Sequence, residues 1–384
     1  MSAPGSEDRP WKSLAEIVKS GTLKTLKPGD TLLLRSGFHG SIVIEGNNSD
    51  VITIAAQKRN KPQLSHLIVK GKKWTFRGLT ISPTFDKSYK AAGRELGIVE
   101  LAEGSPSSDI TIEDCFIYNT LNSSSWGSRE WMAAGNGIWQ GGDGTNITLR
   151  NNYILNVRFG IQCCSYNSVC EGNVISDFSA DGIRVTRDGE VVQYNVIKNV
   201  YVNAKDGDKN HDDGIQCFLY NVGTGTVKNI VTRGNVIINR ENPAQKYTNT
   251  LQGIGYFDGP LVNFVAEDNV VLVDMWHGVS LYDAQNCTIT GNSCYSIWTG
   301  KSNLRPWVQL GGKAGAARGN TVKNNQAMSF DLKADKSVKA ENNTIVTAKS
   351  FAKALEKAMA DINGKFGAIH ELSGKKRFEK IDIR

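Results

Sequence analysis

The chain lacks long apolar runs, has little proline and shows no patterned cysteines. No stretch approaches the ~20 apolar residues of a transmembrane helix, so we expect no membrane partner. Proline contributes 9 of 384 residues, whereas glycine contributes 39. Because glycine and asparagine accept the positive φ angles of tight corners, this balance predicts many short strands joined by turns.

The seven cysteines include no CxxC or Cys/His pair at zinc spacing. We therefore predict buried free thiols, with Cys163 and Cys217 on inward positions of the repeat described below. The first eight residues contain no basic segment followed by an apolar one, so no export leader is visible in them. The expected location is nevertheless extracellular or virion-associated, where the substrates considered below occur.

The net charge is +7, which favours an acidic partner such as an anionic polysaccharide. Basic and aromatic residues are not interleaved as single-stranded nucleic acid would require, so we expect no nucleic-acid partner. Assembly into a homotrimer stays open from the sequence.

A short pattern recurs along the chain: two alternating apolar residues, two polar residues, Asn and a further apolar residue. It is clear at Ile147–Ile154, and successive copies are separated by about 18 to 23 residues or by about 33 to 40. A turn of this length with period-2 strands predicts a β-solenoid, with the Asn in a tight αL bend and bonded to the next Asn along the stack. The Asn residues of the copies are 152, 173, 195, 235, 269, 292, 325 and 343, with Leu79 and Cys115 in the same slot earlier.

A second strand in each turn begins with glycine and an apolar residue, as in Gly160-Ile161 and Gly182-Ile183. The apolar residue should point inward and the next residue outward. This alternation predicts an outward ladder on one face of the rod, formed by Trp139, Gln162, Arg184, Gln216, Gly255 and Ser280.

We therefore predict an all-β fold, a right-handed single-stranded parallel β-helix of about ten rungs with short helical caps at both ends. The expected divisions are an N-terminal cap at 1–30, the β-helix at 31–347 and a C-terminal helical cap or tail at 348–384. The segments Trp11–Lys19 and Phe351–Ile362 have helical spacing.

The opening Pro28-Gly29-Asp30, the rung Phe76–Ile81 and the repeated Gly-Ile strands resemble the right-handed β-helix superfamily. That group includes pectate lyases, polygalacturonases, alginate and chondroitin lyases and phage tailspike depolymerases. The resemblance covers roughly residues 25–347. It implies action on polysaccharides without selecting one chemistry.

The densest polar cluster is the stretch 205–214, and one rung earlier lies Asp181. Asp181 and Asp213 fall in the same slot before a glycine, on rungs about 4.8 Å apart, so their repulsion should raise one pKa. A proton-holding acid beside an ionised base is what glycosidic cleavage requires. The predicted catalytic residues are Asp181, Asp212, Asp213 and His211; the competing interpretation is that these Asp residues cap turns.

Polygalacturonases carry an Asp-Asp pair followed by glycine and a third Asp one rung away, which Asp212, Asp213 and Asp181 resemble. Their Gly-His-Gly and Arg-Ile-Lys motifs are absent here, and His277-Gly278 is the possible substitute for the histidine.

The predicted function is an endo-acting glycoside hydrolase that cleaves an acidic polysaccharide with no cofactor. One alternative is a polysaccharide lyase in the same place, assisted by calcium at Asp206 and Asp208. Another is a non-catalytic carbohydrate-binding protein or phage spike scaffold. The predicted substrate-binding residues are Trp139, Gln162, Arg184, Lys205, Lys209, Gln216, His277 and Tyr282.

Overall fold

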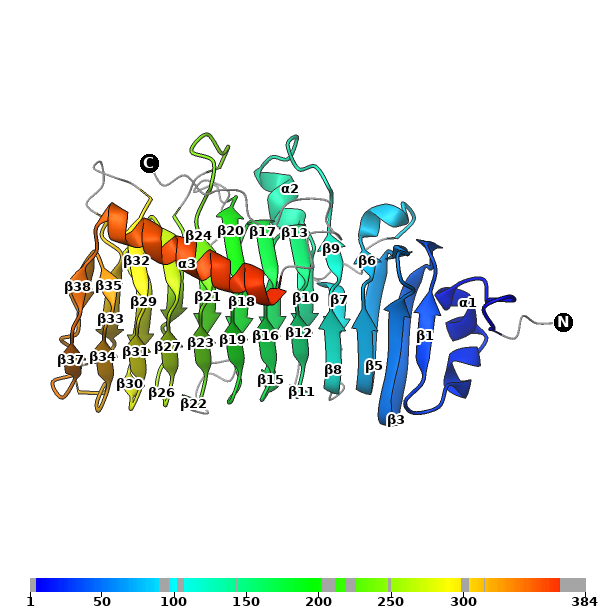
Figure 1. The fold of residues 1–384 in the computed structure, drawn as a ribbon, viewed down its shortest axis with the longest axis horizontal. Coiled ribbons are helices and arrows are strands. Elements are labelled where there is room, and N and C mark those ends of the chain that lie inside the picture. Colours follow the sequence, from blue (N-terminus) through cyan, green and yellow to red (C-terminus); the bar gives the residue numbers. More distant parts are fainter. Residues whose placement is uncertain are drawn as a thin grey trace.

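The computed structural model describes residues 5–89, 97–101, 107–141, 144–201, 211–217, 226–247, 250–297, 304–313 and 315–366. The chain coils into a right-handed parallel β-helix, drawn out along one long axis (Figure 1). Every strand pairing is parallel, between consecutive turns of the coil. The fold class predicted from the repeat is thereby confirmed.

Three sheets run along the rod. The largest has 23 strands and contains two rows, joined at the N-terminal end by three strands. These three are β1 (Thr31–Leu34), β3 (Ser41–Ala56) and β5 (His66–Arg77). The first row is β7 (Gly97–Leu101), β10 (Asn136–Gln140), β14 (Ile161–Cys163), β18 (Ile183–Val185), β21 (Asp213–Cys217), β25 (Gln252–Tyr256), β29 (His277–Tyr282), β33 (Trp307–Gly311) and β36 (Ser329–Asp331).

The second row of this sheet follows the first along the chain in each turn. It is β8 (Ser108–Glu113), β12 (Thr148–Arg150), β16 (Val169–Glu171), β19 (Val191–Gln193), β23 (Val231–Arg233), β27 (Val265–Glu267), β31 (Thr288–Thr290), β34 (Thr321–Lys323) and β37 (Lys339–Glu341). The short strands β11 (Gly144–Thr145) and β15 (Ser165–Tyr166) lie between the two rows, where β22 (Val227–Lys228), β26 (Leu261–Val262) and β30 (Ala284–Gln285) form a separate small sheet.

The twelve-stranded sheet closes the other side of the coil. Its strands are β2 (Gly37–Phe38), β4 (Pro62–Leu64), β6 (Thr80–Ile81), β9 (Phe116–Tyr118), β13 (Tyr153–Val157), β17 (Val174–Phe178), β20 (Val196–Val200), β24 (Val236–Ile238), β28 (Val270–Val273), β32 (Ser293–Ser296), β35 (Gln326–Ala327) and β38 (Thr344–Ile345).

The core is the stack of inward side chains. On the first row it consists of the apolar residue after each glycine, fully or almost fully buried, at Ile138, Ile161, Ile183, Ile215, Ile254 and Val279. All seven cysteines are buried and free, as predicted. Because each apolar side chain packs on the equivalent one of the next rung, the alternation in the sequence sets the register of the whole rod.

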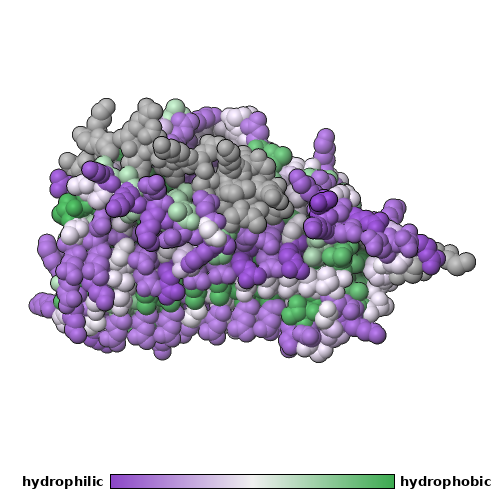
Figure 2. All heavy atoms as spheres, viewed as in Figure 1, coloured by the Kyte–Doolittle hydropathy of each residue, from purple (hydrophilic) through white to green (hydrophobic). Residues whose placement is uncertain are grey.

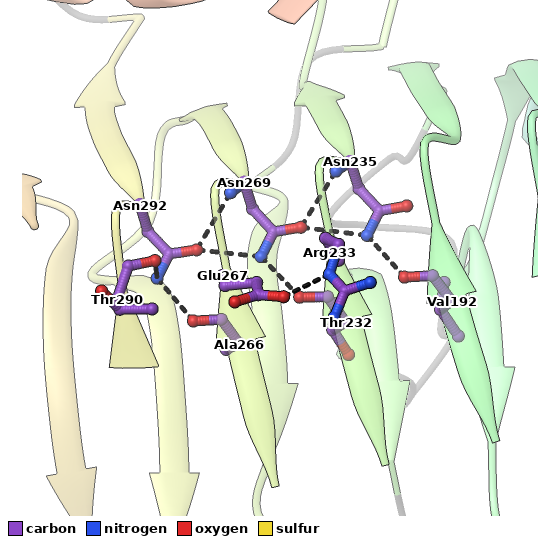
Figure 3. Close-up of polar contacts among 9 residues, drawn as sticks. All are labelled: Val192, Thr232, Arg233, Asn235, Ala266, Glu267, Asn269, Thr290 and Asn292. Atoms are coloured by element: carbon purple, nitrogen blue, oxygen red, sulfur yellow. Dashed lines mark hydrogen bonds and ion pairs between the residues drawn. The ribbon is translucent and has the colours of Figure 1, made fainter. Parts of the chain in front are cut away.

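The asparagines form a hydrogen-bonded ladder at the corner between the second row and the twelve-stranded sheet (Figure 3). Nδ2 of Asn269 donates to the carbonyl of Thr232 and to Oδ1 of Asn292, both at 2.9 Å. The predicted hydrogen bonds between successive Asn residues are confirmed, but the prediction that the Asn itself takes the αL conformation was wrong. The residue before each ladder Asn takes the positive φ: Asn151, Gly172, Tyr194, Gly234, Asp268, Gly291, Asn324 and Asn342. Asp114, before Cys115 in the same slot, does so too. The ladder Asn thus keeps its amide inside the corner.

The helices are short except for the last. They are α1 (Leu14–Lys19), η1 (Thr22–Thr25), η2 (Pro83–Phe85), α2 (Ser128–Ala133) and α3 (Ala348–Phe366). Helix α1 packs against β3 at the N-terminal end, where a cap was predicted. Helix α3 instead lies lengthwise on the outer face of the twelve-stranded sheet, across β24, β28 and β32, and buries Phe351, Leu355 and Ile362 there (Figure 1). Its apolar stripe matches the apolar outer face of that sheet better than the narrow end of the rod.

The described surface is largely hydrophilic in the view of Figure 2, with hydrophobic residues in small separate patches. Among the described residues, no helix has the length and apolar character that crossing a bilayer demands.

Candidate active site

The outward ladder predicted from the Gly-apolar strands exists in the predicted register. Trp139 pairs with Gln162, Gln162 with Arg184, and Arg184 with Gln216. The ladder continues past the predicted members and comprises Glu100, Trp139, Gln162, Arg184, Gln216, Gly255, Ser280, Gln309 and Asp331. One face of the first row therefore presents nine consecutive ladder positions, seven of which carry polar side chains, with Trp139 and Gly255 as the exceptions.

Asp181 and Asp213 occupy neighbouring rungs, Asp181 two residues before β18 and Asp213 at the start of β21. The backbone N–H of Asp213 donates to Oδ1 of Asp181 at 2.9 Å, and Nε of Arg184 donates to its Oδ2 at 2.5 Å. Both carboxyl side chains have 0% exposure, whereas the Arg184 side chain has 15%. The Arg184 guanidinium carbon also lies 4.1 Å from the centre of the Phe159 ring. Asp181 is thus an anchor for Arg184 and for the backbone of the next rung.

His211 lies beside Asp213 and is the exposed partner of the pair. Its Nδ1 hydrogen-bonds Oδ2 of Asp213 at 2.7 Å, and Nε2 of Gln216 donates to the same oxygen at 3.2 Å. The His211 side chain is 54% exposed. A substrate lying on this face would touch His211 before either carboxyl.

Burial shifts the protonation of this pair towards neutral pH. Loss of solvent raises the pKa of Asp213 to about 7, against the opposing hydrogen bond from His211, and the neighbouring Asp181 charge adds to the rise. The hydrogen bond to Asp213 raises the pKa of His211. One proton is therefore held close to neutrality between a buried acid and an exposed imidazole.

Gly255 makes room for the second oxygen of Asp213. A Cβ at this ladder position would lie 2.5 Å from Oδ1 of Asp213 and 2.4 Å from the Phe257 ring, closer than real side chains allow. This Oδ1 is buried and accepts no hydrogen bond from any residue within the described ranges. The absence of a side chain at 255 is therefore a condition for the position of Asp213.

Aromatic rings extend the site along the ladder. The Phe257 ring lies between those of His211 and His277, with centroids 5.6 and 4.9 Å away, and Tyr282 packs on its edge at 5.2 Å. Burial lowers the pKa of His277 to about 4, with a smaller contribution from the His211 charge. His277 is consequently neutral at physiological pH.

Three further predicted residues, Asp212, Trp139 and Gln162, lie on the same rung as Asp213 or on the rungs that precede Arg184. Asp212 is buried, and its carbonyl accepts from the N–H of Gln252 on the next rung. Trp139 packs edge-on against Phe159 at 5.9 Å, and Gln162 is buried between Trp139 and Arg184 in the ladder. Lys205, Asp206, Asp208 and Lys209 fall outside the described residues, and the described part of the chain holds no group of three metal-binding side chains.

Sequence reasoning missed three aromatic residues of the site: Phe159, Phe257 and Trp307. Phe159 precedes Gly160 just as Asp181 precedes Gly182, so the repeat could have found it. Trp307 pairs with His277 across a register shift, so counting along the repeat could not have identified Trp307.

No family model matches this chain, and no curated protein matches it. Solved structures do. The DFA-IIIase of Arthrobacter chlorophenolicus A6 has a TM-score of 0.53 at 12% identity, covering 90% of this chain and 86% of that one. The same enzyme without its lid gives 0.52 at 11% identity, with 86% and 89% covered.

A mannuronic acid specific polysaccharide family 6 lyase from human gut microbiota gives a TM-score of 0.48 at 13% identity, with 94% and 97% covered. At these identities the likeness is one of fold. The chain has the right-handed parallel β-helix fold, which is the fold of the group that its sequence resembles.

Proposed function

We propose that this protein is a polysaccharide-degrading enzyme whose proton-transfer group is His211, positioned by Asp213. One observation carries the proposal: two fully buried carboxyls lie beneath a half-exposed imidazole on a polar face of the rod. A histidine held by a buried carboxylate is a common general base or acid. The polysaccharide-acting members of the fold superfamily support the substrate class, and an extracellular or virion-associated location would suit such a substrate.

The reaction that this burial favours is β-elimination on an acidic glycan. His211 would remove the proton α to a uronate carboxyl, and the electron pair would form the carbon–carbon double bond as the bond to the glycosidic oxygen breaks. The imidazolium of His211 would then give its proton to the leaving glycosidic oxygen. Arg184, on the ladder next to Gln216 and bonded to Asp181, is a cation of the same face that would offset the uronate charge. The net charge of +7 would attract such a substrate.

Hydrolysis is the second candidate, and the raised pKa of Asp213 next to Asp181 is the observation in its favour. Asp213 would supply a proton through His211 to the leaving oxygen. A hydrolase also needs a base or nucleophile that reaches water or the sugar. The burial of Asp181 and its two occupied oxygens oppose that role, and elimination is therefore placed first.

A panel of acidic and neutral polysaccharides tests the proposal. Elimination would produce new ultraviolet absorbance from the unsaturated product, whereas hydrolysis would produce reducing ends without it. His211→Ala should abolish either signal, and Asp213→Asn should lower it about a hundredfold or more. Glu267→Gln is the matched control, because Glu267 faces outward on the second row of the same turn as Gly255 and pairs with Arg233 (Figure 3). Binding without any product from the whole panel would point to a scaffold and overturn the enzyme.

A further inference from the structure

A pocket of about 740 Å³ opens at the C-terminal end of the outward ladder, beyond the His211 site. We call it the basic pocket. It lies between the turns that follow β33 and β36, and ladder residues Gln309 and Asp331 form part of it. Its charged and aromatic lining residues are Tyr282, Asp283, Lys313, Asp331, Lys333 and Lys336.

Hydrogen bonds to two aspartates hold both turns in place. Oδ1 of Asp283 accepts from the backbone N–H of Lys313 at 2.7 Å. In the other turn, buried Asp335 accepts from Asn320 Nδ2 at 2.8 Å and from the Ser337 N–H at 2.7 Å. Because these bonds fix the backbone on either side, Lys313, Lys333 and Lys336 project from pre-organised turns, which lowers the entropic cost of binding a ligand.

One wall of the basic pocket is the ring of Tyr282, which packs against the backbone of Gly311. A Cβ at Gly311 would lie 2.3 Å from the Tyr282 ring, so only glycine lets the ring lie against the next rung. Tyr282 also packs on Phe257, which in turn contacts the ring of His211. The aromatic surface is thus continuous from the His211 site to the basic pocket.

The charges of the pocket favour an anion. Three exposed lysines outnumber two carboxyls, Asp283 and Asp331. Asp283 is engaged by the backbone of Lys313, and Asp331 accepts from Nε2 of Gln309 at 3.4 Å. Each carboxyl accepts a hydrogen bond from within the protein. The three lysines are therefore the charged groups that face solvent.

We propose that the basic pocket binds an acidic sugar residue of the glycan, stacking it on Tyr282 and pairing its carboxylate or sulfate ester with the three lysines. This rests on the proposed function and adds a place where a second acidic residue of the same glycan would bind. Gln309 lies three rungs from Gln216 on the ladder, a span of about 14 Å at the spacing of parallel strands. The pocket is therefore a distal subsite for an extended chain that reaches from it to His211.

The test measures glycan binding separately from cleavage. The triple variant Lys313→Gln, Lys333→Gln and Lys336→Gln is made in an inactive His211→Ala background. Affinity electrophoresis compares polygalacturonate, alginate and dextran sulfate with neutral dextran and inulin. The matched control removes the same charge elsewhere, with Lys58→Gln, Lys349→Gln and Lys353→Gln at exposed positions outside the pocket.

At low salt we expect the pocket variant to bind at least one acidic glycan about tenfold more weakly than the control variant, and to lose much of the salt dependence. Tyr282→Ala should weaken the same interaction at any salt concentration. Equal affinities of the pocket and control variants for every acidic glycan would overturn the subsite, even if wild-type protein cleaves those glycans. A pocket-dependent affinity in a protein that cleaves none of them would leave the subsite standing and overturn the proposed function.

Discussion

The indole Nε1 of Trp307 lies 3.3 Å from Nδ1 of His277 and donates a hydrogen bond to it. Because an indole N–H can only donate, Nδ1 of His277 must be the acceptor. The Ser280 hydroxyl lies 2.9 Å from the same nitrogen and can donate to it as well. The proton of neutral His277 therefore resides on Nε2.

This relationship predicts the nitrogen NMR spectrum of His277. With its pKa lowered to about 4, the ring should keep one tautomer, protonated at Nε2, from neutral pH down to about pH 5. Trp307→Phe removes the donor and should introduce the other tautomer. A His277 resonance that titrates near the ordinary histidine value of about 6.5 would contradict the burial argument.

The dependence of activity on pH should report the His211–Asp213 pair. A base works when unprotonated, so kcat/KM should rise with pH through the raised pKa of His211. Asp213→Asn removes the charge that raises this pKa, so the rising limb should move to lower pH. The rate on the plateau should fall about a hundredfold or more, since the imidazole loses its orienting partner. An unchanged profile would remove Asp213 from the mechanism.

Gly255→Ala tests the close approach of the ladder backbone to Asp213. The added methyl group would collide with Oδ1 of Asp213 and with the Phe257 ring, and we expect loss of activity with the β-helix retained by circular dichroism. Gly364→Ala is the control, since a Cβ there meets nothing within 4 Å. Wild-type activity in Gly255→Ala would show that Asp213 can move without consequence.

Glu190 should make stability depend on pH. It is buried, and its Oε2 accepts from the N–H groups of Thr186 at 2.7 Å and Arg187 at 2.9 Å. Burial raises its pKa from 4.5 to about 8. Since the folded value exceeds the unfolded one, the stabilisation is complete below about pH 4.5 and is lost as the pH rises through about 8.

We therefore expect Glu190→Gln to flatten the decline of Tm over that pH window, because Gln cannot ionise. Thermal unfolding of both proteins across the window measures the effect. Parallel curves for the two proteins would show that Glu190 is not the group responsible.

Each Asn of the ladder should contribute more to the free energy of unfolding inside the rod than at its end. Asn269→Ala leaves the Thr232 carbonyl and the Asn235 N–H without their buried partner. We expect a loss on the order of 3 kcal/mol from the free energy of unfolding. Asn343→Ala, on the partly exposed last rung, should cost clearly less. Urea unfolding of both variants provides the comparison, and equal losses would contradict the ladder's dependence on burial.

The alternation of apolar residues and the repeated Asn and Gly determined the fold class, the outward ladder and the adjacency of Asp181 and Asp213. These are readable from sequence because each turn pairs with the next in register, so positions in the repeat become positions in space. The same local pattern identified the apolar stripe of α3 but not where it packs. Its place along the twelve-stranded sheet depends on the apolar outer face that the strands form only together.

The roles within the site required the tertiary structure. In the sequence, Asp181 and Asp213 are equivalent residues before a glycine, and both read as catalytic carboxyls. Only the folded structure shows that both side chains are buried and that Arg184 forms an ion pair with Asp181. It also shows that His211 is the solvent-exposed residue of the His211–Asp213 pair. Burial and pKa depend on every chain segment packed around a group, including Phe257 and Trp307, which no repeat places. The sequence by itself determined where the candidate site lies, and three-dimensional packing decided which of its residues are exposed to solvent.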